Sequence, residues 1–332
     1  MTDQLIVIEA HTSCLDASVA NCLDRLEDRD RSRLVVLSLF EGAEVSTDML
    51  AVLSMQKQVP ARFGNMSTKA WASLLDRIVD MGLLERLSMG CVRPHPALQG
   101  HLHRVWRDQA EAAFTEEKEE AEQALINAVA SLSRLYQSLI EMGHADRALA
   151  LIDLQRRTLR RVLGDALTRQ HYRLAQYIVQ PLNEYWKVRG MMTEANDWAE
   201  RIRSVVEGEA GVAPEFESDA GALWLFAVGS HANRLINARQ LDRAEAIYTE
   251  IIRILEESEA TSAKQRLGVA FHQLGVVIQE RGDLDSAEAW YKKSLMMKET
   301  VGDRRGMASS FHQLGMVAQE RDNLDSAEVW YT

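Results

Sequence analysis

The sequence is poor in the residues that interrupt helices and in those that cross-link chains. It has 5 prolines and 18 glycines in 332 residues, with 46% hydrophobic and 26% charged residues, a composition typical of a helical globular protein. Its three cysteines, Cys14, Cys22 and Cys91, are too few for a disulfide framework. We therefore expect a reducing compartment, and the cytoplasm is the predicted location.

Long apolar runs are missing as well. Runs such as residues 5–8 and 34–39 are far shorter than the roughly 20 residues that a membrane-spanning helix needs. The N-terminal stretch MTDQLIVIEAHTS has no basic residues before its short apolar segment, so we expect no signal peptide. The sequence thus predicts no membrane partner.

The chain also has no excess of positive charge. The chain has 38 Lys and Arg against 49 Asp and Glu, and neither the first 110 residues nor the remainder is basic. Neutralisation of phosphates supplies much of the affinity of proteins for nucleic acids. A nucleic-acid partner is therefore not expected.

The residues of a nucleotide-hydrolysing site are also lacking. No Gly-x-x-x-x-Gly-Lys-Ser/Thr P-loop occurs, and no acidic strand could serve as a Walker B motif. No nucleophile stands beside a base in a recognisable pattern. We expect no enzymatic activity from this chain and no cofactor.

What the sequence does contain is an internal repeat. The segment FHQLGVVIQERGDLDSAEAWY at 271–291 recurs as FHQLGMVAQERDNLDSAEVWY at 311–331, with 16 of 21 positions identical. Weaker copies are LDRAEAIY at 241–248, RGMMTEANDW at 189–198 and MGHADRALALI at 142–152. Five units are predicted to start near residues 128, 175, 224, 267 and 307.

Each unit has the pattern of two helices joined by a tight turn. Apolar residues at helical spacing from Phe271 are followed by a turn at Gly282 and then by a second periodic run. Gly275 and Ala287 are small where the helices should cross, and Tyr291 should fill the space beside them. These residues resemble the tetratricopeptide repeat signature, and the resemblance implies an α-solenoid over 128–332, its last repeat truncated.

The first hundred residues do not follow the pattern of the repeats. We expect helices at 13–29, 31–40, 46–55 and 67–81, with caps at Ser46 and Ser67. The runs LLERL and CVRP, separated by Ser-Met-Gly, predict a hairpin, and a last helix should begin at Pro96. The predicted fold class is therefore all-α. A winged-helix domain with a small β-hairpin (1–110) and a charged helical connector (111–127) precede the solenoid.

The order of these parts is similar to the region that follows the ATPase domain in STAND signalling NTPases of the NB-ARC type. The segments that carry the resemblance are LVVLSLFEGAEVSTDML at 34–50, LLDRIVDMGLLERL at 74–87, VRPHPALQGHL at 92–102 and LNEYWKVRGMMTEANDWAERI at 182–202. The resemblance implies a sensor segment. Its repeats would recognise a protein trigger, and its winged helix would relay the event to a nucleotide-binding domain outside this chain, in cis or in trans.

One histidine has a counterpart in that family. His95 matches the histidine that contacts the β-phosphate of ADP, although Pro94 and Pro96 replace its usual neighbours. The resemblance makes His95 a candidate nucleotide-sensing residue. The alternative is a structural histidine that closes the hairpin onto the next helix.

The concave groove of the array is the main candidate site, for a protein or peptide ligand. The residues expected to face it are Asn233, Asn237, His272, Val276, Gln279, Glu280, His312, Met316, Gln319 and Glu320. The alternative is a solvated face that is noticeable only because the repeats duplicate it. Pairs of His and Gln favour binding, because an open groove has no evident structural need for them.

Other sites are less favoured. Cys91, His95, His101 and His103 match no common zinc spacing, so no metal is expected. The candidate DNA-recognition helix at 67–81 offsets its Lys and Arg with two Asp residues. The rival interpretations are a free-standing tetratricopeptide adaptor and a winged-helix transcription regulator. The last repeat should expose Trp330 and Tyr331, which predicts self-association through that end.

The missing P-loop generates the first prediction. Without backbone amides and a lysine to hold phosphates, the purified chain should neither hydrolyse ATP nor bind it with micromolar affinity. Isothermal titration calorimetry and a phosphate-release assay measure the two properties. A micromolar dissociation constant for ATP would contradict the prediction.

Overall fold

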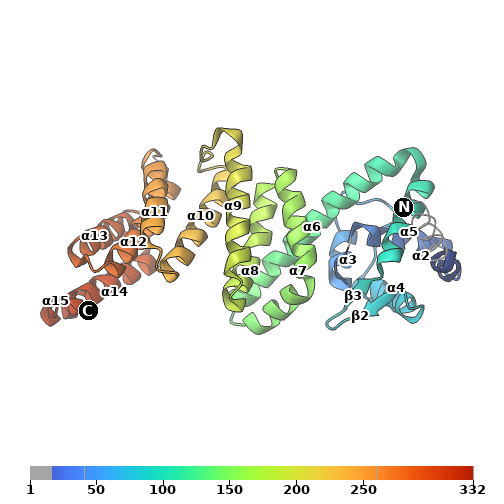
Figure 1. Ribbon diagram of the computed structural model, residues 1–332, viewed down its shortest axis with the longest axis horizontal. Coiled ribbons are helices and arrows are strands. Elements are labelled where there is room, and N and C mark those ends of the chain that lie inside the picture. Colours follow the sequence, from blue (N-terminus) through green and yellow to red (C-terminus); the bar gives the residue numbers. More distant parts are fainter. Residues whose placement is uncertain (1–16, 41, 259, 332) are drawn as a thin grey trace, which may run out of the picture. The chain divides into compact units, whose positions relative to one another are not determined.

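The computed structural model describes residues 17–40, 42–258 and 260–331 and is mostly helical (Figure 1). It divides into two compact units, Met1–Tyr185 and Trp186–Thr332. The boundary falls inside helix α8 (Tyr172–Arg189).

The first unit begins with short helices. Residues 17–23 are helical, and α2 (Asp28–Leu34) continues into the 3₁₀ turn η1 (Val35–Leu39). The expected helices at 13–29 and 31–40 are therefore wrong in their bounds, and residues 13–16 lie outside the described residues. All five residues of η1 are buried, whereas a regular α-helix of this length would turn some of them toward solvent. Tertiary burial thus overrides the helical period.

The next two helices begin where the sequence predicts. The Ser46 hydroxyl accepts from the Met49 amide at the start of α3 (Thr47–Ser54), and Ser67 accepts from Ala70 at the start of α4 (Thr68–Asp80). Both capping predictions are confirmed. The two helices are joined by a buried hydrogen bond, in which Trp71 Nε1 donates to Ser54 Oγ at 2.9 Å.

A small antiparallel sheet follows, and α5 (Pro96–Ala110) comes directly after it. The predicted hairpin is present as β2 (Leu84–Arg86) and β3 (Cys91–Pro94). The sequence did not predict β1 (Val45–Ser46), which pairs with the other edge of β3 and gives the order β1-β3-β2. Two residues are too short a run to show alternation, so only the tertiary pairing reveals this strand.

The helical array begins without a break after the N-terminal segment. After the turn η2 (Glu111–Ala113), α6 (Phe114–Glu141) runs through both the predicted connector and the first helix of the first repeat. It is followed by α7 (Ala145–Thr168), which makes the first helix pair. Most charged residues of the predicted connector thus lie in a longer helix, where some are exposed and others, such as Glu117 and Glu122, are half-buried.

The second unit is built of successive helices. They are α9 (Met192–Glu207), α10 (Asp219–Asn237), α11 (Leu241–Glu256), α12 (Thr261–Glu280), α13 (Leu284–Thr300), α14 (Arg304–Glu320) and α15 (Leu324–Tyr331), with the turn η3 (Gly208–Ala210) before α10. The turns within the pairs share a residue with positive φ, namely Gly143, Gly190, Arg239, Gly282 and Asp322. This residue ends the first helix of a pair in the left-handed conformation, which glycine adopts most easily.

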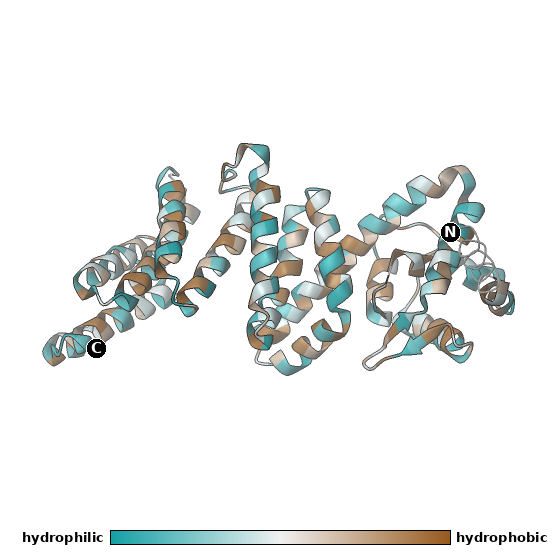
Figure 2. Ribbon diagram, viewed as in Figure 1, coloured by the Kyte–Doolittle hydropathy of each residue, from teal (hydrophilic) through white to brown (hydrophobic). Residues whose placement is uncertain are grey.

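The crossing of α12 and α13 depends on small residues. A Cβ atom on Gly275 would lie 2.7 Å from Cε1 of Tyr291, and Ala287 is completely buried. The same approach recurs one repeat later between Gly315 and Tyr331. Apolar and polar stretches alternate along the helices, as this amphipathic packing requires (Figure 2).

The crossing predicts how two neighbouring alanines of α13 respond to enlargement. Ala287→Leu should lower the free energy of unfolding by about 1–3 kcal/mol, because the extra atoms overpack the contact. Ala289→Leu is the matched control, since Ala289 lies in the same helix and is exposed. Urea unfolding followed by circular dichroism measures both. Equal losses in the two variants would show that the repeat register is wrong.

Candidate protein-binding surface

The first helices of the last three pairs are linked at their C-terminal ends. Arg239, in the turn after α10, forms an ion pair with Glu280 of α12. Gln279 of α12 donates from Nε2 to Glu320 Oε1 of α14 at 2.6 Å. Two links thus connect the expected binding row from α10 to α14 at the ends of its helices, and Gln279 and Glu320 are two of its members in direct contact.

The paired His and Gln residues have a structural use that sequence reasoning missed. Tyr291 donates its hydroxyl to Gln279 Oε1 at 2.7 Å, and its ring lies 5.4 Å from that of His272. In the next repeat Tyr331 donates to Gln319 Oε1 at 2.9 Å, and its ring lies 5.8 Å from that of His312. The duplicated polar residues therefore contact a tyrosine of their own repeat, which is fully buried at 291 and exposed at 331, and this weakens their value as evidence for binding.

The remaining residues of the row differ in availability. Asn233 accepts a hydrogen bond from the Tyr248 hydroxyl at 2.6 Å, so it serves the same purpose as Gln279. Asn237 is exposed, and Val276 and Met316 are half-buried. The apolar pair, Asn237 and the exposed His312 are members of the row that a ligand could contact without breaking a hydrogen bond described here.

A buried lysine marks the contact between α13 and α14. Lys298 is 3% exposed, and its Nζ donates to Ser310 Oγ at 2.9 Å. Ser294 Oγ lies 3.1 Å from Ser310 Oγ and donates to the Gly268 carbonyl at 2.7 Å. A Cβ on Gly268 would lie 3.2 Å from Cγ of Lys298, so the glycine makes room for the lysine stem.

His272 stands beside this polar contact. Burial and the charge of Lys298 lower the pKa of His272 from 6.5 to about 4. Its Nδ1 atom is buried and has no hydrogen-bond partner among the described residues. Burial also lowers the pKa of Lys298 from its ordinary value, while Asp303 opposes that shift. Folding therefore favours the neutral form of His272.

Ion pairs link each of the last helix pairs to the one before it. Arg281 contacts Asp242 and Glu245 of α11. One repeat later Arg321 contacts Asp285 and Glu288 of α13. The repetition places the second helix of one pair beside the turn of the next. Exposed pairs of this kind contribute little energy, so they fix register more than they stabilise.

His95 has a structural role in the first unit. Its Nδ1 accepts a hydrogen bond from the Ala97 amide at 3.2 Å and so caps α5. Its own amide donates to the Leu83 carbonyl at 3.1 Å, which ties the hairpin to the helix. The side chain is exposed. These contacts are those of the structural alternative, and a role in nucleotide sensing stays a prediction.

The other residues considered from sequence do not gather into a site. Burial raises the pKa of the Cys91 thiol to about 11. Within 17–40, 42–258 and 260–331, no group of three or more His, Cys, Asp or Glu is placed to hold a metal ion. On α4, Arg77 pairs with Asp30 at 2.5 Å, and Asp76 pairs with Arg86 at 2.8 Å.

The helices of the described residues include none that could cross a bilayer.

Buried polar contacts join β1 and the loop before it to α7 within the first unit. Thr158, fully buried, donates its hydroxyl to the Glu44 carbonyl at 2.6 Å. Ser46 Oγ lies 3.4 Å from Gln155 Oε1, and Gln155 Nε2 donates to the Tyr136 hydroxyl at 3.0 Å. Such contacts are costly to break, because separation of the two segments must rehydrate every group. The N-terminal segment and the first helix pair therefore form one cooperative body.

Comparison with known proteins identifies the last repeats. The tetratricopeptide repeat family model matches residues 266–332. This segment consists of tetratricopeptide repeats. No curated protein matches the chain.

Two solved structures are similar to larger parts of the chain. BtubC (BKLC) from P. vanneervenii is 19% identical with a TM-score of 0.46, and the match covers 69% of this chain and 83% of that one. A STAND protein with a tetratricopeptide repeat sensor from Pyrococcus horikoshii is 13% identical with a TM-score of 0.41. That match covers 93% of this chain, which spans 50% of the length of the STAND structure.

The environment of His272 predicts a loss of stability in acid. Because the pKa of His272 is lowered from 6.5 to about 4, its contribution is present above pH 6.5 and is lost as the pH falls to 4. We compare the free energy of unfolding of His272→Phe with that of the wild type at each pH. The difference should shift in favour of the variant by about 2–3 kcal/mol between pH 7 and pH 4. Urea unfolding at a series of pH values measures this difference.

His312→Phe provides the matched control for this experiment. His312 holds the same place beside Tyr331 but is exposed, so the variant makes the same exchange without the burial of His272. A pH-dependent difference of the same size in both variants would contradict the assignment to His272.

Proposed function

We propose that this chain is a protein-interaction sensor in which the repeats bind a peptide or protein segment along α10, α12 and α14. The observation that carries the proposal is the pair of contacts Arg239–Glu280 and Gln279–Glu320, which link α10 to α12 and α12 to α14 at the C-terminal ends of these helices. Parallel exposed helix faces of this kind form an extended surface that suits a segment of another chain. Val276 and Met316 supply its apolar contacts and Asn237 an amide.

The second part of the proposal concerns the N-terminal segment. We propose that residues 1–110 are a winged-helix domain that passes the binding event to a nucleotide-binding domain of the STAND type, which this chain lacks. The order of the parts and the resemblance of segments such as 34–50 support this assignment. The buried Thr158–Glu44 contact supports it as well, because it couples the N-terminal segment mechanically to the first helix pair.

A selected ligand and two charge insertions test the binding surface. Peptides are selected from a random phage-displayed library against the full 332-residue chain, and their affinities are measured by fluorescence anisotropy. We expect Val276→Glu and Met316→Glu to weaken binding at least about tenfold, since each buries a charge under the ligand. The control Ala289→Glu places the same charge on an exposed site of α13.

The outcome separates the proposal from its rivals. Failure to enrich any peptide, or weakening by Ala289→Glu alone, would contradict binding along this row. Retention of a DNA duplex by the same samples would favour the transcription-regulator alternative. Sedimentation velocity on the same samples tests self-association through α15, where Leu324 and Val329 are exposed.

A further inference from the structure

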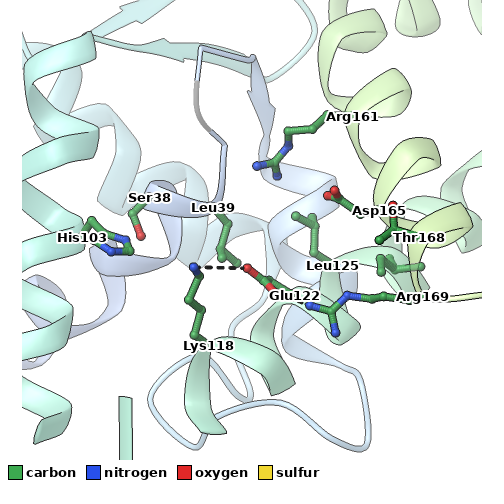
Figure 3. Close-up of a pocket in the computed structure, with 11 residues that line it drawn as sticks. Ser38, Leu39, His103, Lys118, Glu122, Leu125, Arg161, Asp165, Thr168 and Arg169 are labelled. Carbon is green, nitrogen blue, oxygen red and sulfur yellow. Dashed lines mark hydrogen bonds and ion pairs between the residues drawn. The ribbon is translucent and has the colours of Figure 1, made fainter. Parts of the chain in front are cut away.

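A cavity of about 360 Å³ lies in the first unit between the N-terminal segment and the first helix pair. Ser38 and Leu39 of η1 and His103 of α5 line one side, and residues of α6 and α7 line the others (Figure 3). Four elements from separate parts of the sequence thus meet at one hollow. The cavity contains none of the residues of the proposed peptide-binding row.

The cavity is more positive than the protein around it. Its lining includes three permanent cations, Lys118, Arg161 and Arg169, and two carboxylates, Glu122 and Asp165. The whole chain, in contrast, has a net charge of −11. A positive hollow in an acidic protein draws anions toward itself, because the low-dielectric walls focus its field.

The charges inside the cavity can be rearranged by a ligand. Glu122 serves two cations, since it pairs with Arg169 and lies 3.7 Å from Lys118 Nζ, beyond normal hydrogen-bond length. Lys118 and Arg169 are about a third exposed, so an entering anion can reach both. Figure 3 shows the Arg161 guanidinium directed into the same space from the side opposite Lys118.

The other lining groups define the class of anion. Ser38 donates its hydroxyl proton to the Val35 carbonyl, and Thr168 donates to the Gly164 carbonyl, so the lining side chains that can donate to a ligand are the three cations and His103. Guanidinium and ammonium groups together suit the oxygens of a phosphate. Leu39, Leu125 and Ile126 are almost fully buried and add a small apolar wall, whose exposed edge a bare phosphate ion would leave uncovered.

We propose that this cavity binds a small phosphate monoester, with Lys118, Arg161 and Arg169 contacting the phosphate and the apolar wall contacting its carbon skeleton. The ligand must displace Glu122 from its cations, which limits the dissociation constant to roughly 0.1–1 mM. An affinity in this range is compatible with the absence of micromolar ATP binding. The site does not depend on the proposed peptide-binding function.

The test uses glycerol 3-phosphate as the probe, titrated into the full chain by calorimetry at constant ionic strength. We expect saturable binding that weakens at least about tenfold in Lys118→Gln and in Arg161→Gln. Lys69→Gln removes an exposed cation from α4 of the same unit and should bind as the wild type does. Circular dichroism melts confirm that each variant is folded.

A fourth variant distinguishes a binding site from a merely structural ion-pair cluster. Glu122→Gln removes the internal competitor of the phosphate and should tighten binding several-fold, which a structural role of Glu122 would not produce. Inorganic phosphate should bind more weakly than glycerol 3-phosphate, because it leaves the apolar wall exposed. The absence of saturable heat up to 10 mM probe, binding unchanged in Lys118→Gln and Arg161→Gln, or weaker binding in Glu122→Gln would each overturn the proposal.

Discussion

The close approach of a glycine to a tyrosine ring is the contact on which the last repeats depend. At the α12–α13 crossing, Gly275 leaves the space that Tyr291 fills, and Ala287 is buried in the same crossing. Once the ring is placed there, its hydroxyl needs an acceptor, because an unsatisfied buried polar group costs free energy. Gln279 supplies that acceptor, and its amide nitrogen then reaches Glu320 of the next pair. The packing of Tyr291 within one helix pair thus also positions Gln279 for a hydrogen bond to the next helix pair.

The same requirement is met with different residues in the preceding pair. Tyr248 crosses near Ala232, the counterpart of Gly275, and its hydroxyl donates to Asn233 and not to a glutamine. What the repeats share is therefore a tyrosine whose hydroxyl has an acceptor, while the position of the acceptor varies and the ring is buried only at 248 and 291. The tyrosine contacts account for the recurrence of Gln at 279 and 319 as acceptors and of His at 272 and 312 as ring neighbours, and Val276 packs partly against the core, which leaves Met316 and Asn237 without such a role.

The sequence could predict those parts of the fold that depend on neighbours along the chain. Local interactions could be predicted because each involves residues close together in the sequence. Examples are the caps at Ser46 and Ser67, the turn at Gly282 and the small residues of the repeats. The 3₁₀ turn at 35–39 and the strand β1 were not predicted, because burial and pairing with β3 decide them. The lysine contact was missed for the same reason: Lys298, Ser310 and Gly268 come from three helices. A signal was present, however, since the positions of the preceding repeat that match Ser294 and Lys298 are the apolar residues Ile251 and Leu255.

That exchange of apolar for polar residues has a consequence for the array as a whole. In a solenoid each repeat is stabilised mainly by its neighbours, so the total stability is close to a sum of contact energies between adjacent repeats. Ile251 and Leu255 bury apolar surface beside α12, whereas Ser294 and Lys298 meet α14 through a short chain of hydrogen bonds around an amine. Removing a charged amine from water costs more than these bonds return, unless the amine is neutral. At these two positions, therefore, the contact between α13 and α14 gains less from apolar burial than the contact between α11 and α12 does.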